Sequence, residues 1–185
     1  MTILPRKFYS KDTVTVAKNL LGKKIIRKIG RHEISGIITE TEAYRHRDDP
    51  ASHAFGKITD RNKIMFEEVG TAYVYFTYGM YFCFNVVAKS PKKAAGAVLI
   101  RAIEPEKGIN IMQVNRGKTD LKNLTNGPAK LAQAFGITKE DYGVDLTKKS
   151  KLYITEGINR KKITSSPRVG ISKAVDKLWN FKIEI

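Results

Sequence analysis

The chain has 185 residues, with 34 Lys and Arg against 18 Asp and Glu, and its formal net charge is +16. A length of this order predicts one domain over residues 1–185, and the charge excess, unless it serves solubility alone, favours a polyanionic partner, because neutralised phosphates release their counterions. A single cysteine, Cys83, excludes a disulfide framework and a cysteine zinc cluster, and without a long apolar stretch we expect no signal peptide and no membrane span, hence a soluble intracellular protein.

The first half of the chain is predicted to contain one short helix and two strands before a polar loop. Ser10 or Asp12 is placed to cap the helix, and apolar patterns predict strands at residues 23–29 and 34–44. Residues 45–62 are polar and contain proline and glycine, which is typical of a loop.

The second half begins with the apolar, aromatic segment 73–87, which is broken by one glycine and so predicts a hairpin. Another strand is predicted at residues 96–103. Helices are predicted from Pro105 to about Arg116 and from Pro128 onward, and the tail is expected to end in a short strand. Because strands outnumber helices, the sequence predicts an α+β fold: a single domain around a mostly antiparallel curved β-sheet, with peripheral helices and a protruding β-hairpin.

The predicted hairpin carries two large side chains at its tip. With Tyr78, Gly79 and Met80 as a three-residue loop, the strand periodicity places Tyr73, Tyr75 and Asn85 on one face and the more apolar residues on the other. Exposed bulky groups on a turn usually mark an interaction site, and in a basic protein they suggest a wedge between stacked base pairs. The alternative is a tip that folds back onto a neighbouring loop or a dimer partner.

The stretch ETEAY places Glu40, Glu42 and Tyr44 on one face of a strand. A carboxylate beside a tyrosine ring suits a pocket in which the ring stacks while the acid acts, although a half-exposed edge strand with solvated acids is the alternative. The cluster HRDDPASH, with His46 and His53, matches no helical metal-binding spacing, so we expect no metal. No phosphate-binding or dinucleotide-binding glycine motif is present, and we expect no cofactor.

Seven stretches together closely resemble the alkyladenine DNA glycosylase family, that is, the 3-methyladenine DNA glycosylases of the single-domain mammalian type. They are ITETEAY, ASH, TDRN, GTAYVYFTYGMYFCFN, VLIRAIEP, NGPAKLAQAFGI and SPRVGIS. The resemblance covers nearly the whole chain in order, and it is weakest over the lysine-rich stretch 86–100.

The resemblance implies a pocket for a damaged base that has been flipped out of the DNA. By their positions in the motifs, Glu42 would activate the attacking water, and Tyr44, His53 and Tyr75 would sandwich the extruded base. Asn85 would crowd the 2-amino group of normal guanine.

The same resemblance implies contacts with the DNA outside the pocket. Tyr78 would enter the minor groove and fill the gap left by the flipped nucleotide, with Met80 beside it. Arg101 would lie near the DNA backbone, and Arg61 and Lys130 are weaker matches to backbone contacts.

The implied function is hydrolysis of the N-glycosidic bond of damaged purines in double-stranded DNA, which leaves an abasic site for base excision repair. No lysine falls among the matched pocket residues, so we expect a monofunctional enzyme, and a monomer. The base preference stays open, because neutral bases such as hypoxanthine need protonation and the sequence identifies no general acid. Two alternatives are a DNA-binding or RNA-binding protein without catalysis and an enzyme that cleaves small nucleosides.

Overall fold

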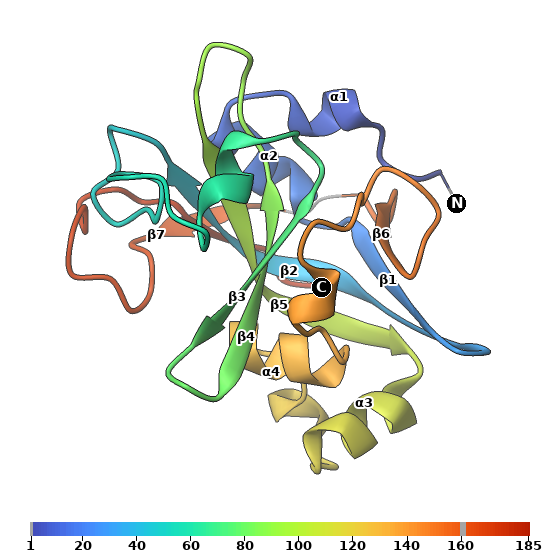
Figure 1. The fold of residues 1–185 in the computed structure, drawn as a ribbon. Coiled ribbons are helices and arrows are strands. Elements are labelled where there is room, and N and C mark those ends of the chain that lie inside the picture. The colour runs from blue at the N-terminus through green and yellow to red at the C-terminus, as the bar shows by residue number, and fades with distance from the viewer. Residues whose placement is uncertain (1, 160–161) are drawn as a thin grey trace.

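The computed structural model describes residues 2–159 and 162–185, and its centre is a curled sheet of eight strands (Figure 1). All strand pairings in it are antiparallel. The main path runs β3-β4-β5-β2-β1-β6, and β8 pairs with both β2 and β7. The strands are β1 (Lys24–Ile29), β2 (His32–Arg45), β3 (Ala72–Thr77), β4 (Tyr81–Val87), β5 (Gly96–Lys107), β6 (Leu152–Thr155), β7 (Thr164–Ser166) and β8 (Asn180–Lys182).

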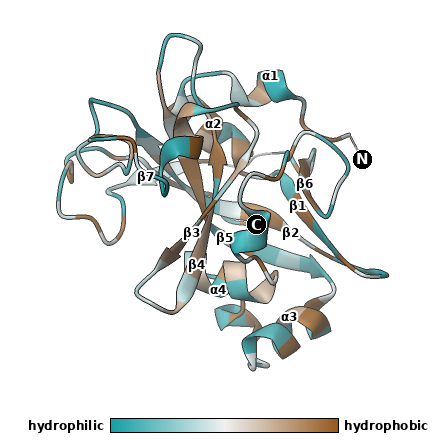
Figure 2. Cartoon of the chain, in the orientation of Figure 1, coloured by the Kyte–Doolittle hydropathy of each residue, from teal (hydrophilic) through white to brown (hydrophobic). Residues whose placement is uncertain are grey.

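Helices cover one face of this sheet and bury the main apolar core against it. Residues from α2, α3 and α4 and from the inward face of the central strands form the core, which includes Leu20, Ile38, Phe84, Ile100 and Leu131. Figure 2 shows apolar residues continuing along strands β3 and β4 into the body of the domain. The helical elements are α1 (Arg6–Tyr9), α2 (Thr13–Leu20), α3 (Ile109–Arg116), α4 (Pro128–Ala134) and the 3-10 turns η1 (Lys63–Phe66), η2 (Leu121–Asn123) and η3 (Lys139–Asp141).

The predicted α+β fold with a protruding hairpin is confirmed, and so are most of the predicted elements. Of the two candidate caps, Asp12 is the residue used: its side chain accepts a hydrogen bond from the Val14 amide at 3.0 Å. The hairpin has the predicted register, with Thr77 opposite Tyr81 and a loop of three residues between them.

The predicted helix start at Pro105 is wrong. Strand β5 continues through Pro105, which pairs with Gly36, and helix α3 begins only after Gly108. Proline is tolerated here because β4 pairs with β5 only over Ala97–Leu99. Among the described residues, one side of β5 at Pro105 therefore has no neighbouring strand, and the missing N–H breaks no ladder. The turn into the helix is made instead by Gly108, at φ 71°.

Candidate active site

One row of paired residues crosses six strands of the sheet. The register places next to one another, in order, Tyr73, Asn85, Leu99, Glu42, Asn180 and Ser166. Directly paired residues point to the same face of a sheet, so residues distant in sequence are gathered on the face opposite the main core. The backbone pairing therefore builds the site, and Glu42 lies near the middle of it.

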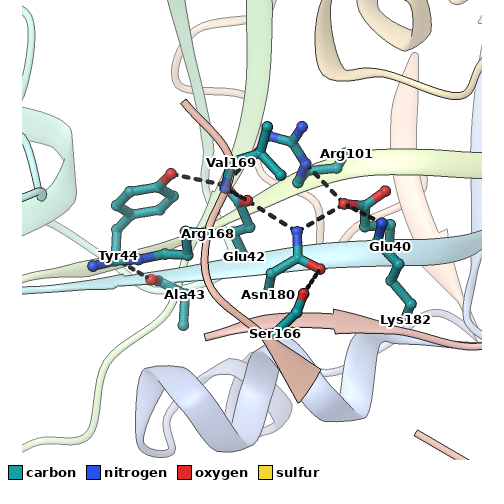
Figure 3. A network of polar contacts seen from close by, with 10 residues as sticks. All are labelled: Glu40, Glu42, Ala43, Tyr44, Arg101, Ser166, Arg168, Val169, Asn180 and Lys182. Atoms are coloured by element: carbon teal, nitrogen blue, oxygen red, sulfur yellow. Dashed lines mark hydrogen bonds and ion pairs between the residues drawn. The ribbon is translucent and has the colours of Figure 1, made fainter. Parts of the chain in front are cut away.

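The carboxylate of Glu42 is fully buried and accepts four hydrogen bonds (Figure 3). Its Oε1 accepts from the Val169 amide at 2.8 Å and from Asn180 Nδ2 at 3.0 Å. Its Oε2 accepts from the Tyr44 hydroxyl at 2.7 Å and, at the longer distance of 3.4 Å, from Arg101 Nη1. Each of these four neighbours donates a hydrogen bond to the carboxylate, so the positions of both its oxygens are fixed.

A second carboxylate, Glu40, shares two of these donors. Glu40 Oε1 accepts from Asn180 Nδ2 at 2.7 Å and from Arg101 Nε at 3.0 Å, and Lys182 Nζ lies 3.4 Å away. Arg101 is the extra residue of a β-bulge in β5, because the register shifts between the pairs Thr41–Ile100 and Glu40–Ala102. Bulges re-aim side chains near active sites, and this one places the guanidinium between the two acids.

A cavity of about 510 Å³ opens beside this carboxylate network and has aromatic walls. Tyr44, His53, Tyr73, Tyr75 and Asn85 all line it. The His53 and Tyr75 rings meet edge to face with their centroids 4.7 Å apart, and the Tyr73 and Tyr75 rings lie 5.3 Å apart. The sequence predicted four of these residues as a base pocket, and the structure brings all four together.

The Tyr44 ring is held from outside the cavity by Arg168. The guanidinium carbon lies 4.6 Å from the centre of the Tyr44 ring, and the guanidinium forms a two-pronged pair with Asp49, both contacts at 2.6 Å. Both partners are buried. Because Val169, the next residue, donates to Glu42, the loop that carries Arg168 fixes the stacking ring and the carboxylate together.

The titratable groups of the cavity do not supply an obvious acid. The pKa of His53 is lowered to about 4, mainly because the ring is partly withdrawn from water and secondly because of the positive charge of Arg61. His53 is therefore neutral at pH 7, with Nδ1 2.8 Å from the Tyr73 hydroxyl. Burial raises the pKa of the Cys83 thiol and of the Tyr44 and Tyr75 hydroxyls, so these groups stay protonated.

The hairpin tip stands free at the edge of the cavity. Tyr78 lines the cavity mouth, yet its surface is 84% exposed, and Met80 is 63% exposed. Tyr78 has φ 51° and Gly79 has φ 67°, and the Met80 amide closes the turn onto the Thr77 carbonyl at 3.2 Å. The alternative of a tip folded back onto a loop does not hold among the described residues, and both side chains project outward.

The three residues that the sequence assigned to the DNA backbone occupy different environments. Arg101 and Arg61 both line the cavity. Lys130 lies on α4 outside the cavity lining, where its Nζ donates to Asn126 Oδ1 at 2.7 Å and to Asn123 Oδ1 at 3.1 Å. The role of each in DNA binding stays a prediction.

Sequence reasoning missed the residues that support Glu42 from the C-terminal part of the chain. Arg168 and Val169 belong to the stretch SPRVGIS, which contributed to the family resemblance without an assigned role. Asn180 gave no signal, because one asparagine in a mixed tail has no periodicity. Within residues 2–159 and 162–185, no group of three or more His, Cys, Asp and Glu gathers as metal ligands, and the Asp49 carboxylate is occupied by Arg168.

A sequence model of the methylpurine-DNA glycosylase family matches residues 7–185 of the chain. This chain belongs to the methylpurine-DNA glycosylase family. A protein of Carboxydothermus hydrogenoformans with the provisional name 3-methyladenine DNA glycosylase is 46% identical over 98% of this chain and 95% of its own length. Relatives with the same provisional name from Clostridium acetobutylicum and Francisella tularensis are each 45% identical, over 98% and 93% of this chain and 94% and 90% of their own lengths.

As a methylpurine-DNA glycosylase, the protein is a DNA repair enzyme whose substrate is DNA. The family resemblance seen in the sequence is confirmed, and with it the expectation of a monofunctional DNA glycosylase. The alternative of a binding protein without catalysis is not favoured. No helix within the described part of the methylpurine-DNA glycosylase has the length and apolarity to cross a membrane.

Proposed function

We propose that this glycosylase rotates an N-alkylated purine out of duplex DNA into the 510 Å³ cavity and hydrolyses its N-glycosidic bond, with Glu42 as the base. The observation that carries the proposal is a buried carboxylate that is fixed by four donors, three of which, Tyr44, Arg101 and Val169, line an aromatic cavity. An enzyme that acts on a base within a duplex must take it out of the stack. The exposed Tyr78 beside the cavity mouth suits the residue that fills the gap, with Met80 next to it.

The bound base would be recognised by its flat shape and, when alkylated, by its charge. Tyr44, His53 and Tyr75 offer rings for stacking, and an aromatic face attracts a cation by about 0.5–2 kcal/mol. Asn85 is buried and its Nδ2 donates to the Tyr73 carbonyl at 3.1 Å, so its position against the base edge is fixed. A fixed side chain at that edge would exclude normal guanine by contact with its 2-amino group.

In the chemical step, positive charge grows on the sugar as the bond to the base breaks. A water molecule attacks the anomeric carbon and gives its proton to Glu42, while the electrons of the broken bond stay with the departing base. An alkylated cationic base leaves neutral without an added proton. Arg101 holds both Glu42 and Glu40 and would keep Glu42 aimed during the transfer.

The deciding experiment compares Glu42→Gln with Glu40→Gln, a matched control two residues away on the same strand. Duplexes with hypoxanthine or alkylated purines are incubated with protein, and half of each sample receives hot alkali. Glu42→Gln is expected to slow base release at least about 100-fold while DNA binding is retained, and Glu40→Gln is expected to lose much less. Full activity of Glu42→Gln, or tight binding without any base release by the unaltered protein, would overturn the proposal.

Two further expectations complete the proposal. Lys173 also borders the cavity, so borohydride trapping is included, and we expect no trapped protein–DNA complex and no strand break before alkali. We also expect the protein to act with DNA inside the cell. We expect a monomer, because several of the exposed apolar side chains lie on the hairpin, where DNA would cover them. Light scattering in the presence and absence of DNA tests the monomer.

A further inference from the structure

Arg61 holds a position in the cavity wall that a phosphate contact alone does not explain. Its guanidinium carbon lies 4.7 Å from the centre of the Tyr75 ring, and both residues line the cavity. The guanidinium also lies beside the Tyr73 hydroxyl, which contacts His53 Nδ1 at 2.8 Å. Arg61 is thus in contact with the aromatic surface that the proposed function assigns to the flipped base.

The backbone that presents Arg61 is firmly anchored. The next residue, Asn62, is buried, and its Nδ2 donates to the carbonyls of His53 at 2.7 Å and Lys57 at 3.0 Å. Its Oδ1 accepts from the Thr59 amide at 2.7 Å. These bonds tie the Arg61 backbone to the His53 backbone, so the segment that carries the guanidinium is anchored beside His53 at the cavity.

Arg61 is also the cavity arginine whose charge is not neutralised by a carboxylate. Arg101, the other arginine in the cavity wall, pairs with Glu40 and Glu42, and Arg168, which lies outside the wall against Tyr44, pairs with Asp49. Within the described residues, Arg61 forms no ion pair, and the adjacent Asp60 pairs with Lys63 instead. A net positive charge therefore remains at the ring on which the base would stack.

This charge changes what the aromatic wall prefers. A guanidinium over a tyrosine ring already uses the electrostatic attraction of that ring for cations, and it repels a second cation nearby. A neutral purine loses nothing by such repulsion and can stack on the same ring. The lowered pKa of His53, to which Arg61 contributes after desolvation, is the same effect on a cation that would form in this place.

We propose that Arg61 is a specificity-determining residue that shifts base release from positively charged purines toward neutral ones such as hypoxanthine. The inference rests on the proposed function, since it needs a base in this cavity. It predicts that the enzyme releases neutral purines as well as positively charged ones. The shift acts through the fixed charge at Tyr75, and the sequence-predicted role of Arg61 as a phosphate contact is the competing explanation.

The test measures single-turnover release of 7-methylguanine and of hypoxanthine from otherwise identical duplexes. Arg61→Gln removes the charge on an exposed side chain, and Arg61→Lys keeps it. Lys130→Gln is the control for losing a positive charge outside the cavity. Arg61→Gln is expected to raise the ratio of 7-methylguanine release to hypoxanthine release roughly 5-fold. This is the effect expected from the repulsion between a guanidinium and a cationic base that contact the same tyrosine ring in a partly solvated cavity. Arg61→Lys and Lys130→Gln are expected to leave the ratio within about twofold of the unaltered enzyme.

The outcomes separate this inference from the proposed function. If the unaltered protein releases neither base, the proposed function fails, and the inference that rests on it fails with it. A second outcome is that the unaltered protein releases both bases while Arg61→Gln lowers the two release rates equally and weakens DNA binding, with the slope of log K against log salt concentration smaller by about one unit. Arg61 is then a phosphate contact, and the inference is overturned. A ratio that falls in Arg61→Gln would also overturn it, because the charge would then favour cationic bases.

Discussion

Replacing Asp49 with Asn leaves Arg168 as a buried charge without a counter-ion, and we expect this to be the most destabilising single substitution outside the apolar core. Asp49 is 0% exposed and Arg168 is 4% exposed, and the two side chains meet in two contacts of 2.6 Å. Removing one partner of such a buried pair costs about 3–5 kcal/mol. For a domain of this size, that corresponds to a fall of about 6–20 °C in Tm.

The double variant separates the charge effect from the loss of contacts. In Asp49→Asn with Arg168→Met no charge is left buried, so the loss should come mainly from the missing hydrogen bonds, including the one from Arg168 to the Ala43 carbonyl at 2.9 Å. We expect the double variant to be at least about 2 kcal/mol more stable than the sum of the single losses predicts.

The assay is urea unfolding followed by the fluorescence of Trp179, the one tryptophan of the chain, whose ring centre lies 5.2 Å from the Arg168 guanidinium. Far-UV circular dichroism serves as a second probe, because the substitutions change the surroundings of Trp179. A free energy of unfolding for Asp49→Asn within about 1 kcal/mol of the unaltered protein, or strict additivity of the losses in the double variant, would refute the reasoning.

Three more predictions concern the hairpin tip, the carboxylate network and pH. Tyr78→Ala should change stability by less than about 0.5 kcal/mol, since the side chain is 84% exposed, yet lower base release at least about 10-fold in single-turnover assays; equal activity would remove the wedge role. Asn180→Asp replaces a donor that Glu40 and Glu42 share with a third carboxylate, so like-charge repulsion should lower the urea midpoint and single-turnover base release more than Asn180→Ala does; equal losses in the two variants would contradict this. Unfolded His53 binds a proton below pH 6.5, whereas the folded pKa is about 4, so stability should fall as pH drops through this window. His53→Gln should reduce that fall in urea midpoints.

The parts of this protein that follow from local periodicity could be predicted, and the parts that depend on tertiary pairing could not. The alternation in residues 73–87 fixed the hairpin register and the pocket faces of Tyr75 and Asn85, because a strand repeats every two residues. Pro105 misled the prediction because a proline often begins a helix, and only the absence of a neighbouring strand on one side, among the described residues, shows why β5 continues through it.

The support of Glu42 lies beyond what periodicity reveals. Glu42 and Tyr44 share a strand face, and their relation was readable from ETEAY. Asn180 joins them only because β8 pairs with β2, and Arg101 reaches both acids only because of a bulge in β5. Neither feature has a local sequence pattern, since each depends on where two distant strands meet.

The row of residues across six strands also has a consequence for how the enzyme is made. A ribosome that has released the chain as far as β6 has already delivered Glu42 and every predicted aromatic wall of the cavity. It has not yet delivered Val169, Arg168 or Asn180, which supply two of the four donors to the Glu42 carboxylate and the support of the Tyr44 ring. A chain truncated after β6 lacks these contacts, and on the proposed function its release of bases from DNA would depend on completion of the sheet by β7 and β8.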